Sequence, residues 1–223
     1  MTGADYQQIR DSLRSAYDGA ADRRDRKQKA AWKLAERAAF LLLLQAEDCA
    51  RLLEVGAGTG QDSLFFASHG LAVVAADLSP EMVARCRAKG LDARVMDFSR
   101  LDFEAGEFDA VHAMNCLLHV PSAELPSVLA EIARVLRPGG LFFLGVYGGT
   151  GEEGSMSEDD HVPARFFSWR TDEQILEFAS VSFDVIDFHV VGPGTNHRFQ
   201  SLTLRRPLDG PADRTVARTA VTG

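Results

Sequence analysis

Hydrophobic and polar positions follow two different patterns along this chain, and the change between them falls near residue 51. From about residue 5 to residue 44 the sequence is rich in Ala, Arg and Leu and lacks proline, and its apolar residues recur at helical spacing. This pattern predicts one or two helices. From residue 51 onward, short apolar runs end in Gly or Asp and precede longer helical patterns, an alternation typical of a parallel sheet built from βαβ units.

The second pattern predicts five strands, followed by a polar, acidic and glycine-rich connection. After it, a helix is expected to begin near Thr171, with Gln174 as its capping-box partner. Two further alternating runs predict the antiparallel edge of an open sheet. The predicted strands cover 51–55, 72–77, 93–97, 108–115, 141–147, 181–191 and 198–205, and helices are expected near 62–68, 80–89 and 123–136.

Composition and charge narrow the classes of protein. The 223 residues suit one large domain, and the proportions of apolar (46%) and charged (25%) residues are those of a globular protein. A net charge of −8 argues against a nucleic-acid partner, because such proteins usually present a clustered basic face. Lysine and arginine do gather between Arg10 and Arg37, which we interpret as a solvated helix face.

The sequence contains no sign of export or membrane insertion. Its three cysteines are too few and too widely spaced for a disulfide framework. The first ten residues lack the order of a signal peptide, and the longest apolar run, 38–44, is too short to cross a bilayer. We therefore expect a cytoplasmic protein without a membrane partner.

The strongest chemical signal is a glycine-rich turn that follows the first predicted strand. Glycine at positions 56, 58 and 60 lets the backbone bend sharply and lets a ligand approach the main chain. Asp77 ends the next predicted strand, where a carboxylate can accept hydrogen bonds from ribose hydroxyls. Together these residues predict a nucleoside-containing ligand.

A dinucleotide such as NAD is the weaker of two candidates for that ligand. Its fingerprint requires a third glycine where this chain has Gln61. Asp62 would also repel a phosphate at the start of the following helix. An NAD-dependent oxidoreductase is therefore kept only as a less favoured alternative.

Five segments resemble, in order, the motifs of class I S-adenosylmethionine-dependent methyltransferases: LLEVGAGTGQDS, VVAADLSPEM, RVMDFSRLDF, FDAVHAMNCLLHVP and RVLRPGGLFFLGVYG. The resemblance implies a doubly wound α/β fold with a seven-stranded Rossmann-like methyltransferase sheet whose last strand is antiparallel. We accordingly expect an N-terminal helical cap over 1–45, a methyltransferase domain over 46–206 that includes a lid over 148–168, and a flexible tail over 207–223.

The same resemblance implies S-adenosylmethionine as the cofactor and S-adenosylhomocysteine as its product. Transferred residue by residue, it assigns parts of the cofactor to named side chains. Glu54, Gly56, Ala57, Gly58 and Gly60 would hold the methionine part, with Tyr17 over it; Asp77 and Leu78 the ribose; Met82, Asp97 and Phe98 the adenine; and Asn115 and Cys116 the floor under the sulfonium.

The acceptor side is less constrained. His119 follows the fourth predicted strand, where related enzymes open into the acceptor pocket, and it is our candidate for a general base. The alternative is that it only bonds a loop carbonyl. We expect the first half of 148–168 to form a mobile acidic lid and 161–169 to form a wall of the acceptor site. Candidate acceptor-binding residues are His161, Arg165, which is available for a carboxylate, Phe166 and His197.

The predicted activity is transfer of a methyl group to a hydroxyl, amine or similar atom of a small molecule. A non-catalytic S-adenosylmethionine sensor or interaction protein on the same fold is the alternative. We expect a monomer or homodimer. No metal is predicted, because the consecutive residues 158–161 cannot all face one ion in most backbones.

Overall fold

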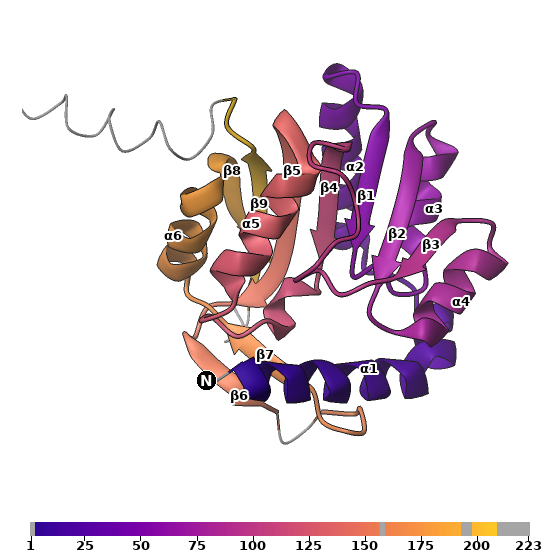
Figure 1. The fold of residues 1–223 in the computed structure, drawn as a ribbon, viewed down its shortest axis with the longest axis vertical. Helices are drawn as coiled ribbons and strands as arrows, with labels where there is room; N and C mark the ends of the chain where they lie inside the picture. The colour runs from indigo at the N-terminus through magenta and orange to yellow at the C-terminus, as the bar shows by residue number, and fades with distance from the viewer. Residues whose placement is uncertain (1–2, 157–158, 193–197, 209–223) are drawn as a thin grey trace, which may run out of the picture.

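Seven strands form one open sheet in the computed structural model, which describes residues 3–156, 159–192 and 198–208 (Figure 1). The strand order is β3-β2-β1-β4-β5-β9-β8, and neighbouring strands are parallel except where β9 pairs with β5 and β8. The predicted fold class is therefore confirmed. The strands are β1 (Arg51–Val55), β2 (Ala72–Asp77), β3 (Asp92–Val95), β4 (Phe108–Met114), β5 (Leu136–Gly148), β8 (Asp184–Val191) and β9 (Arg198–Arg205).

Strands β5 and β8 begin several residues away from the positions that the apolar pattern predicts. β5 begins at Leu136, five residues earlier than predicted, because Leu136 already pairs with Phe108 of β4 before the proline and glycines that follow. β8 begins at Asp184, three residues later than predicted, because the preceding helix continues to Ser182. Both differences lie at element ends, where hydrogen bonding rather than hydrophobic period decides the boundary.

Helices cover both faces of the sheet, and alternate strand residues show which helix covers which face. Leu52 packs in one cluster with Phe40 and Phe66, whereas Leu53 belongs to a different cluster with Leu129 and Ile175. Thus α2 and α3 lie on one face, and α5 and α6 on the other. The helices are α1 (Gly3–Arg26), α2 (Ala31–Ala46), α3 (Gln61–Ser68), α4 (Pro80–Ala88), α5 (Leu125–Val135) and α6 (Asp172–Ser182), with a 3₁₀ turn at Leu117–His119.

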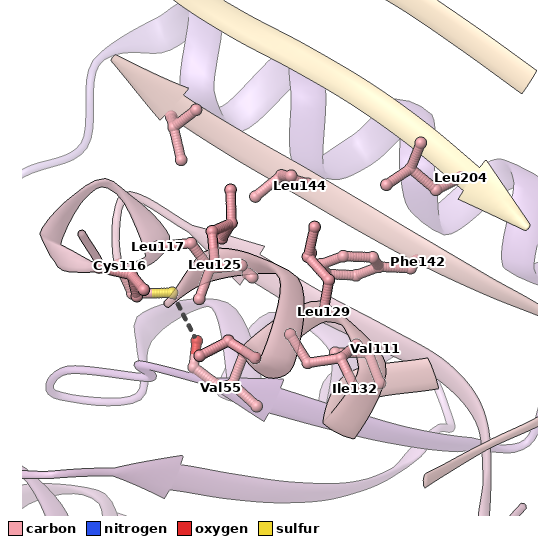
Figure 2. Close-up of a cluster of buried hydrophobic side chains, with 14 of the residues drawn as sticks. Val55, Val111, Cys116, Leu117, Leu125, Leu129, Ile132, Phe142, Leu144 and Leu204 are labelled. Atoms are coloured by element: carbon pink, nitrogen blue, oxygen red, sulfur yellow. Dashed lines mark hydrogen bonds between the residues drawn. The ribbon is translucent and has the colours of Figure 1, made fainter. Parts of the chain in front are cut away.

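The core under α5 fixes the turn that follows β4. Leu125, Leu129 and Ile132 form one apolar stripe on α5 and pack against Phe142 and other strand residues of that face (Figure 2). At the end of β4 the cluster includes Cys116, whose thiol donates to the carbonyl oxygen of Val55 at 3.2 Å. The core thereby holds the ends of β1 and β4 side by side.

The start of α6 has the predicted capping box. The Thr171 hydroxyl accepts from the backbone N–H of Gln174, and the Gln174 side chain accepts in turn from the Thr171 N–H. This arrangement satisfies two backbone donors that have no partner within the helix.

The expected N-terminal cap divides into two parts with different places in the fold. α1 runs along the edge at which the parallel strands end, and its Arg10 and Asp18 contact Asp97 and Ser79 there (Figure 1). α2, in contrast, packs on a face of the sheet and buries Phe40 in its core. Only α1 therefore covers the edge where ligands bind in open α/β sheets.

The connection expected to be a lid contains a two-stranded antiparallel hairpin. Its strands are β6 (Glu152–Ser155) and β7 (Phe166–Trp169), and Glu152 pairs with Trp169. The hairpin lies beside the first turns of α1 (Figure 1). Most of the expected tail, 209–223, falls outside the described residues. None of the helices within the described ranges has the length and apolar character needed to cross a bilayer.

Candidate functional site

The glycine-rich turn between β1 and α3 contains three residues in the left-handed region, with φ of 64° at Gly56, 56° at Gly58 and 78° at Gly60. A Cβ atom at Gly56 would lie 2.3 Å from the Cβ of Cys116, and one at Gly60 would lie 2.6 Å from the side chain of Leu91. A Cβ at Gly58 would meet no atom within 4 Å. Gly56 and Gly60 are thus required by packing, whereas Gly58 faces open space.

Asp77 closes this turn from the neighbouring strand. One carboxylate oxygen accepts from the backbone N–H of Gly58 at 2.8 Å, and the other accepts from that of Ser79 at 2.9 Å. Burial raises the pKa of Asp77 to about 6, against the lowering effect of these two hydrogen bonds. The carboxylate is therefore positioned by the backbone and keeps lone pairs for a further donor.

The opening beside this turn consists of two adjoining cavities. The large cavity has a volume of about 700 Å³, and the small cavity has a volume of about 70 Å³. Both are lined by Tyr17, Arg24, Gly56, Gly58, Met114, Asn115 and His119. Asp77, Leu78, Phe98 and Cys116 line the small cavity alone, whereas Ala57, Lys33, Tyr147, His161, Arg165 and Phe167 line the large one alone.

Asn115 has an unusual backbone and a free polar atom. Its φ is 59°, and its backbone N–H donates to the carbonyl oxygen of Gly145 at 2.7 Å. Its side-chain oxygen Oδ1 is buried and has no hydrogen-bond partner within the described ranges. A buried acceptor without a partner is costly, so Asn115 offers a bonding position to a ligand in the cavities.

Four of the predicted cofactor residues do not line either cavity: Gly60, Met82, Glu54 and Asp97. Met82 is fully buried in the first turn of α4. Glu54 is 3% exposed beneath the glycine-rich turn and accepts a hydrogen bond from the Ser63 hydroxyl. Asp97 accepts from the guanidinium of Arg10 and from the backbone N–H of Ser99. Each supports the walls from behind or from one side rather than lining them.

The sequence analysis did not predict that Glu54 and His112 form a buried polar pair beneath the glycine-rich turn. His112 is fully buried in β4, stacks on Phe143 with ring centroids 5.0 Å apart, and has Nδ1 3.5 Å from Oε1 of Glu54. On α3, Asp62 is 1% exposed and accepts from Lys29 and from Arg37. An isolated polar residue in an apolar run gives no signal of such a partner.

His119 is held from both sides in a wall of the cavities. Its Nδ1 lies 2.6 Å from the carbonyl oxygen of Phe166, and its Nε2 lies 2.6 Å from the hydroxyl of Tyr17. Because a carbonyl only accepts, Nδ1 bears the proton and Nε2 accepts from the Tyr17 O–H. Burial lowers the pKa of His119 to about 3, so the imidazole is neutral at ordinary pH.

The wall that the sequence assigned to 161–169 is held together by ion pairs. Arg165 donates to Asp159 at 2.7 Å and to the hydroxyl of Tyr17 at 3.2 Å. His161 lies 2.7 Å from a carboxylate oxygen of Asp160. Both residues line the large cavity, but the guanidinium of Arg165 is already paired with a carboxylate of this chain.

The aromatic residue of this wall is Phe167, not Phe166. Phe167 is 6% exposed, with its ring centroid 4.9 Å from that of His119. Phe166 contributes its backbone carbonyl to His119 instead. In a β-strand neighbouring side chains point to opposite faces, so a shift of one residue changes which ring reaches the cavity. His197 lies outside the described residues.

Five of the nine basic residues between Arg10 and Arg37 lie around the large cavity, which corrects our interpretation of those five as part of a solvated helix face. Arg23, Arg24, Lys27, Lys29 and Lys33, from the end of α1 to the start of α2, line this cavity. Their helical spacing in the sequence is indistinguishable from that of a surface helix. The missing information is the turn at 27–30, which brings both helix ends to the same opening.

Two groups of potential metal ligands lie close together in the described chain, each with ligand atoms within 4.8 Å of one another. In each group a carboxylate already bonds a cation of this chain: Lys29 and Arg37 bond Asp62, and Arg165 bonds Asp159. The prediction of no metal stays a prediction. The groups are Glu54, Asp62 and His112, and Asp159, Asp160 and His161.

Comparison with known proteins gives methyltransferase relatives. A family model described as a methyltransferase domain matches residues 52–140. A phosphatidylethanolamine N-methyltransferase of Cereibacter sphaeroides is 38% identical over 165 residues, which are 67% of this chain and 79% of that protein. A ubiquinone biosynthesis O-methyltransferase of Xanthomonas oryzae pv. oryzae is 42% identical over 102 residues, but they cover only 42% of its length and 43% of this chain.

Solved structures share the fold at lower identity. The 1,6-didemethyltoxoflavin-N1-methyltransferase of Burkholderia thailandensis, with 1,6-didemethyltoxoflavin and S-adenosylhomocysteine bound, superimposes with a TM-score of 0.70 at 24% identity. That match covers 93% of this chain and 91% of the other. The [4+2]-cyclase SpnF superimposes with a TM-score of 0.62 at 22% identity, covering 82% of this chain and 86% of the other. At such identities the likeness concerns the fold alone.

Proposed function

Because this chain belongs to the class I S-adenosylmethionine-dependent methyltransferases, we propose that its two cavities hold the cofactor and a small-molecule acceptor side by side. The observation on which this proposal rests is the continuous wall from Asp77 through Gly58 and Asn115 to His119. In this wall, polar groups that can bind a nucleoside lie next to the large cavity, which the cofactor's ribose does not fill.

Three features of the wall fit the cofactor. The main chain at Gly58 is open to a ligand, because no side-chain carbon stands there. The Asp77 carboxylate can accept hydrogen bonds from the two ribose hydroxyls. The unpartnered Oδ1 of Asn115 can accept from a cofactor donor, which would remove the cost of leaving that atom buried and unbonded.

When bound, the cofactor supplies a methyl group already activated on a sulfonium. The chain then has to align the acceptor atom with that methyl group and exclude water. Tyr17 of α1 and Phe167 of the hairpin both line the large cavity, and each ring contacts that of His119. We assign the closing of the cavities to α1 and the hairpin, rather than to the whole of 1–45.

A proton must also leave a hydroxyl acceptor, and His119 is the proposed base. Its Nε2 can take that proton only after exchanging the Tyr17 hydroxyl for the acceptor's hydroxyl, because its Nδ1 already donates to a carbonyl. An amine acceptor needs no base before attack, since it can lose its proton afterwards. For such an acceptor, His119 acts by holding Tyr17 in place.

The rival hypothesis is a protein on this fold that performs no methyl transfer. The likeness to the cyclase SpnF shows that the fold alone does not define an activity. A sensor of the cofactor, however, needs no space beside the methyl group. A cavity of about 700 Å³ extending to Tyr147 and His161 favours an enzyme.

The assembly state, the location and the acceptor-binding residues of the enzyme are also proposed. We propose that the enzyme works as a monomer or homodimer in the cytoplasm and does not bind nucleic acid, which its net charge of −8 supports. His161 and Arg165 are proposed to position the acceptor through the shape of the hairpin wall.

Calorimetry with S-adenosylhomocysteine tests the cofactor assignment. We expect binding in the micromolar range and a loss of about 1 to 3 kcal/mol in Asp77→Ala, for the charge-assisted hydrogen bonds left unmade. Asp92→Ala, which removes an exposed carboxylate from β3, is the matched control and should bind as the wild type does. No binding to the wild type, or full affinity in Asp77→Ala, contradicts the proposal. A metabolite screen for production of S-adenosylhomocysteine then identifies the acceptor.

A further inference from the structure

Three cations that line the large cavity have no ion-pair partner among the described residues: Arg24, Lys27 and Lys33. We call them the open cations. The other basic side chains of the wall are compensated. For example, Arg23 pairs with Asp160 at 2.9 Å, and Lys29 pairs with Asp62.

Lys33 is the open cation placed deepest among apolar groups. It is partly buried, and its Nζ lies 5.2 Å from the ring centroid of Trp32 and 5.1 Å from that of Tyr147. Burial, followed by repulsion from Lys29 and Arg24, lowers its pKa to about 8. The aromatic rings stabilise the ammonium only partly, because a desolvated cation is fully compensated only by an anion.

The cofactor cannot supply the missing negative charge. S-adenosylmethionine bears a sulfonium and an ammonium against one carboxylate, so its binding adds positive charge to the cavity. We assign that single carboxylate to Arg24, which lines both cavities. Lys27 and Lys33 line the large cavity alone and remain open.

We propose that the methyl acceptor bears an anionic group, a carboxylate or a phosphate, that binds to Lys33, with Lys27 beside it at the exposed rim of the large cavity. This inference rests on the proposed methyl-transfer function and names the substrate class for it. Lys33 is near the end of β5 and His119 follows β4, so the anion and the reacting atom occupy different parts of the cavity.

The arrangement also explains why Arg165 does not take this role. Its guanidinium is bonded to Asp159 through two nitrogens, and a second carboxylate would have to displace that partner. Among the described residues, the ammonium of Lys33 has ring contacts but no hydrogen-bond acceptor, so its three donors can serve an incoming anion. The unpaired lysine is therefore the better anion site of the two.

Calorimetry on the protein saturated with S-adenosylhomocysteine tests the proposal with three matched probes: benzoate, phenyl phosphate and benzyl alcohol. We expect at least one anionic probe to bind about tenfold or more tightly than the neutral alcohol. Preference for benzoate or for phenyl phosphate identifies the anion as a carboxylate or a phosphate. Equal or tighter binding of the alcohol overturns the proposal.

Variants of single cations test whether Lys33 is responsible for the preference for an anionic probe. Lys33→Met should remove the preference for the anion, while Lys33→Arg should keep it to within about threefold. Arg14→Gln removes an exposed cation of α1 outside both cavities and should leave the preference unchanged. A preference that survives in Lys33→Met overturns the assignment to Lys33.

A normal affinity for S-adenosylhomocysteine in every variant shows that each is folded. That measurement also separates the two hypotheses. Failure of the wild type to bind S-adenosylhomocysteine contradicts the proposed function itself, whereas binding without any preference for an anion contradicts only this inference.

Discussion

The small and the large cavity adjoin, yet they are built from different kinds of contact. The small cavity is organised by backbone groups of neighbouring strand ends, such as the N–H of Gly58 that bonds Asp77, nineteen residues away. The wall of the large cavity also contains side-chain contacts between distant segments: the guanidinium of Arg165, which lines this cavity alone, donates to the hydroxyl of Tyr17 across 148 residues. The charges of the two cavities differ too: Asp77 and Arg24 line the small cavity, whereas Arg24, Lys27 and Lys33, which have no ion-pair partner among the described residues, line the large cavity.

The specificity of such an enzyme for its acceptor therefore resides in the large cavity. A wall organised by backbone groups at neighbouring strand ends suits a ligand that is always the same. A wall of side chains from three distant segments can change its charge and shape without disturbing the sheet.

The largest expected effect is on the turn that both cavities share. Gly56→Ala should lower the free energy of unfolding by about 3 to 4 kcal/mol, the combined cost of a left-handed φ and of forcing a Cβ against Cys116. Gly58→Ala should lower it by only about 1 kcal/mol, because no atom opposes the new carbon.

Urea unfolding measures both changes, and calorimetry completes the contrast. Gly58→Ala should remain folded but lose affinity for S-adenosylhomocysteine, since its new methyl group occupies the cavity. Equal destabilisation of the two variants would show that the turn does not divide into a packing part and a binding part.

The second prediction concerns His119 on the acceptor side. If the acceptor is a hydroxyl, His119→Ala should lower turnover by roughly 100-fold or more while S-adenosylhomocysteine still binds. From the sequence alone, a histidine base predicts a rise in rate near pH 6 to 7. The structure corrects that expectation: with a pKa of about 3, His119 stays neutral from pH 5 to 8 and adds no inflection there.

Steady-state rates with the acceptor identified by the metabolite screen provide the measurement. Tyr17→Phe is the companion variant, because it frees Nε2 of His119 without removing the ring. Unchanged turnover in His119→Ala removes it as base, and an inflection near pH 6.5 that is lost in this variant contradicts the buried neutral state.

The same contrast explains what could be predicted from the sequence. Strands such as 51–55 and 72–77, the turn at Gly56 and the role of Asp77 follow from local patterns: apolar runs, glycines and an acid at a strand end. The capping box of α6 is equally local. Most of the cofactor side of the enzyme can therefore be predicted from local sequence patterns.

The acceptor side was predicted only in part: His119, His161 and Arg165 do line the large cavity, but the other residues of its wall are ordinary in their local context. Lys33 has the spacing of a surface lysine, and only the packing of α2 beside the end of β5 brings it to Tyr147. Phe167 and Phe166 cannot be told apart without the register of β7. Such contacts depend on tertiary geometry, which periodicity does not encode.

The smallest effect is a change of cofactor affinity with pH, and it belongs to the small cavity alone. Burial raises the pKa of Asp77 from 3.8 to about 6, so the carboxyl loses its proton as the pH rises through 6. The ionised form is the one that accepts two ribose O–H donors. At pH 5 Asp77 is ionised in roughly one molecule in ten. S-adenosylhomocysteine should therefore bind about tenfold more weakly at pH 5 than at pH 7.5. Asp77→Asn should bind weakly and without this dependence, because its amide does not titrate. Parallel pH profiles for the wild type and Asp77→Asn, measured by calorimetry, would assign the titration to another group. A flat wild-type profile would mean that Asp77 is already ionised at pH 5, held so by the N–H groups of Gly58 and Ser79 more strongly than burial opposes it.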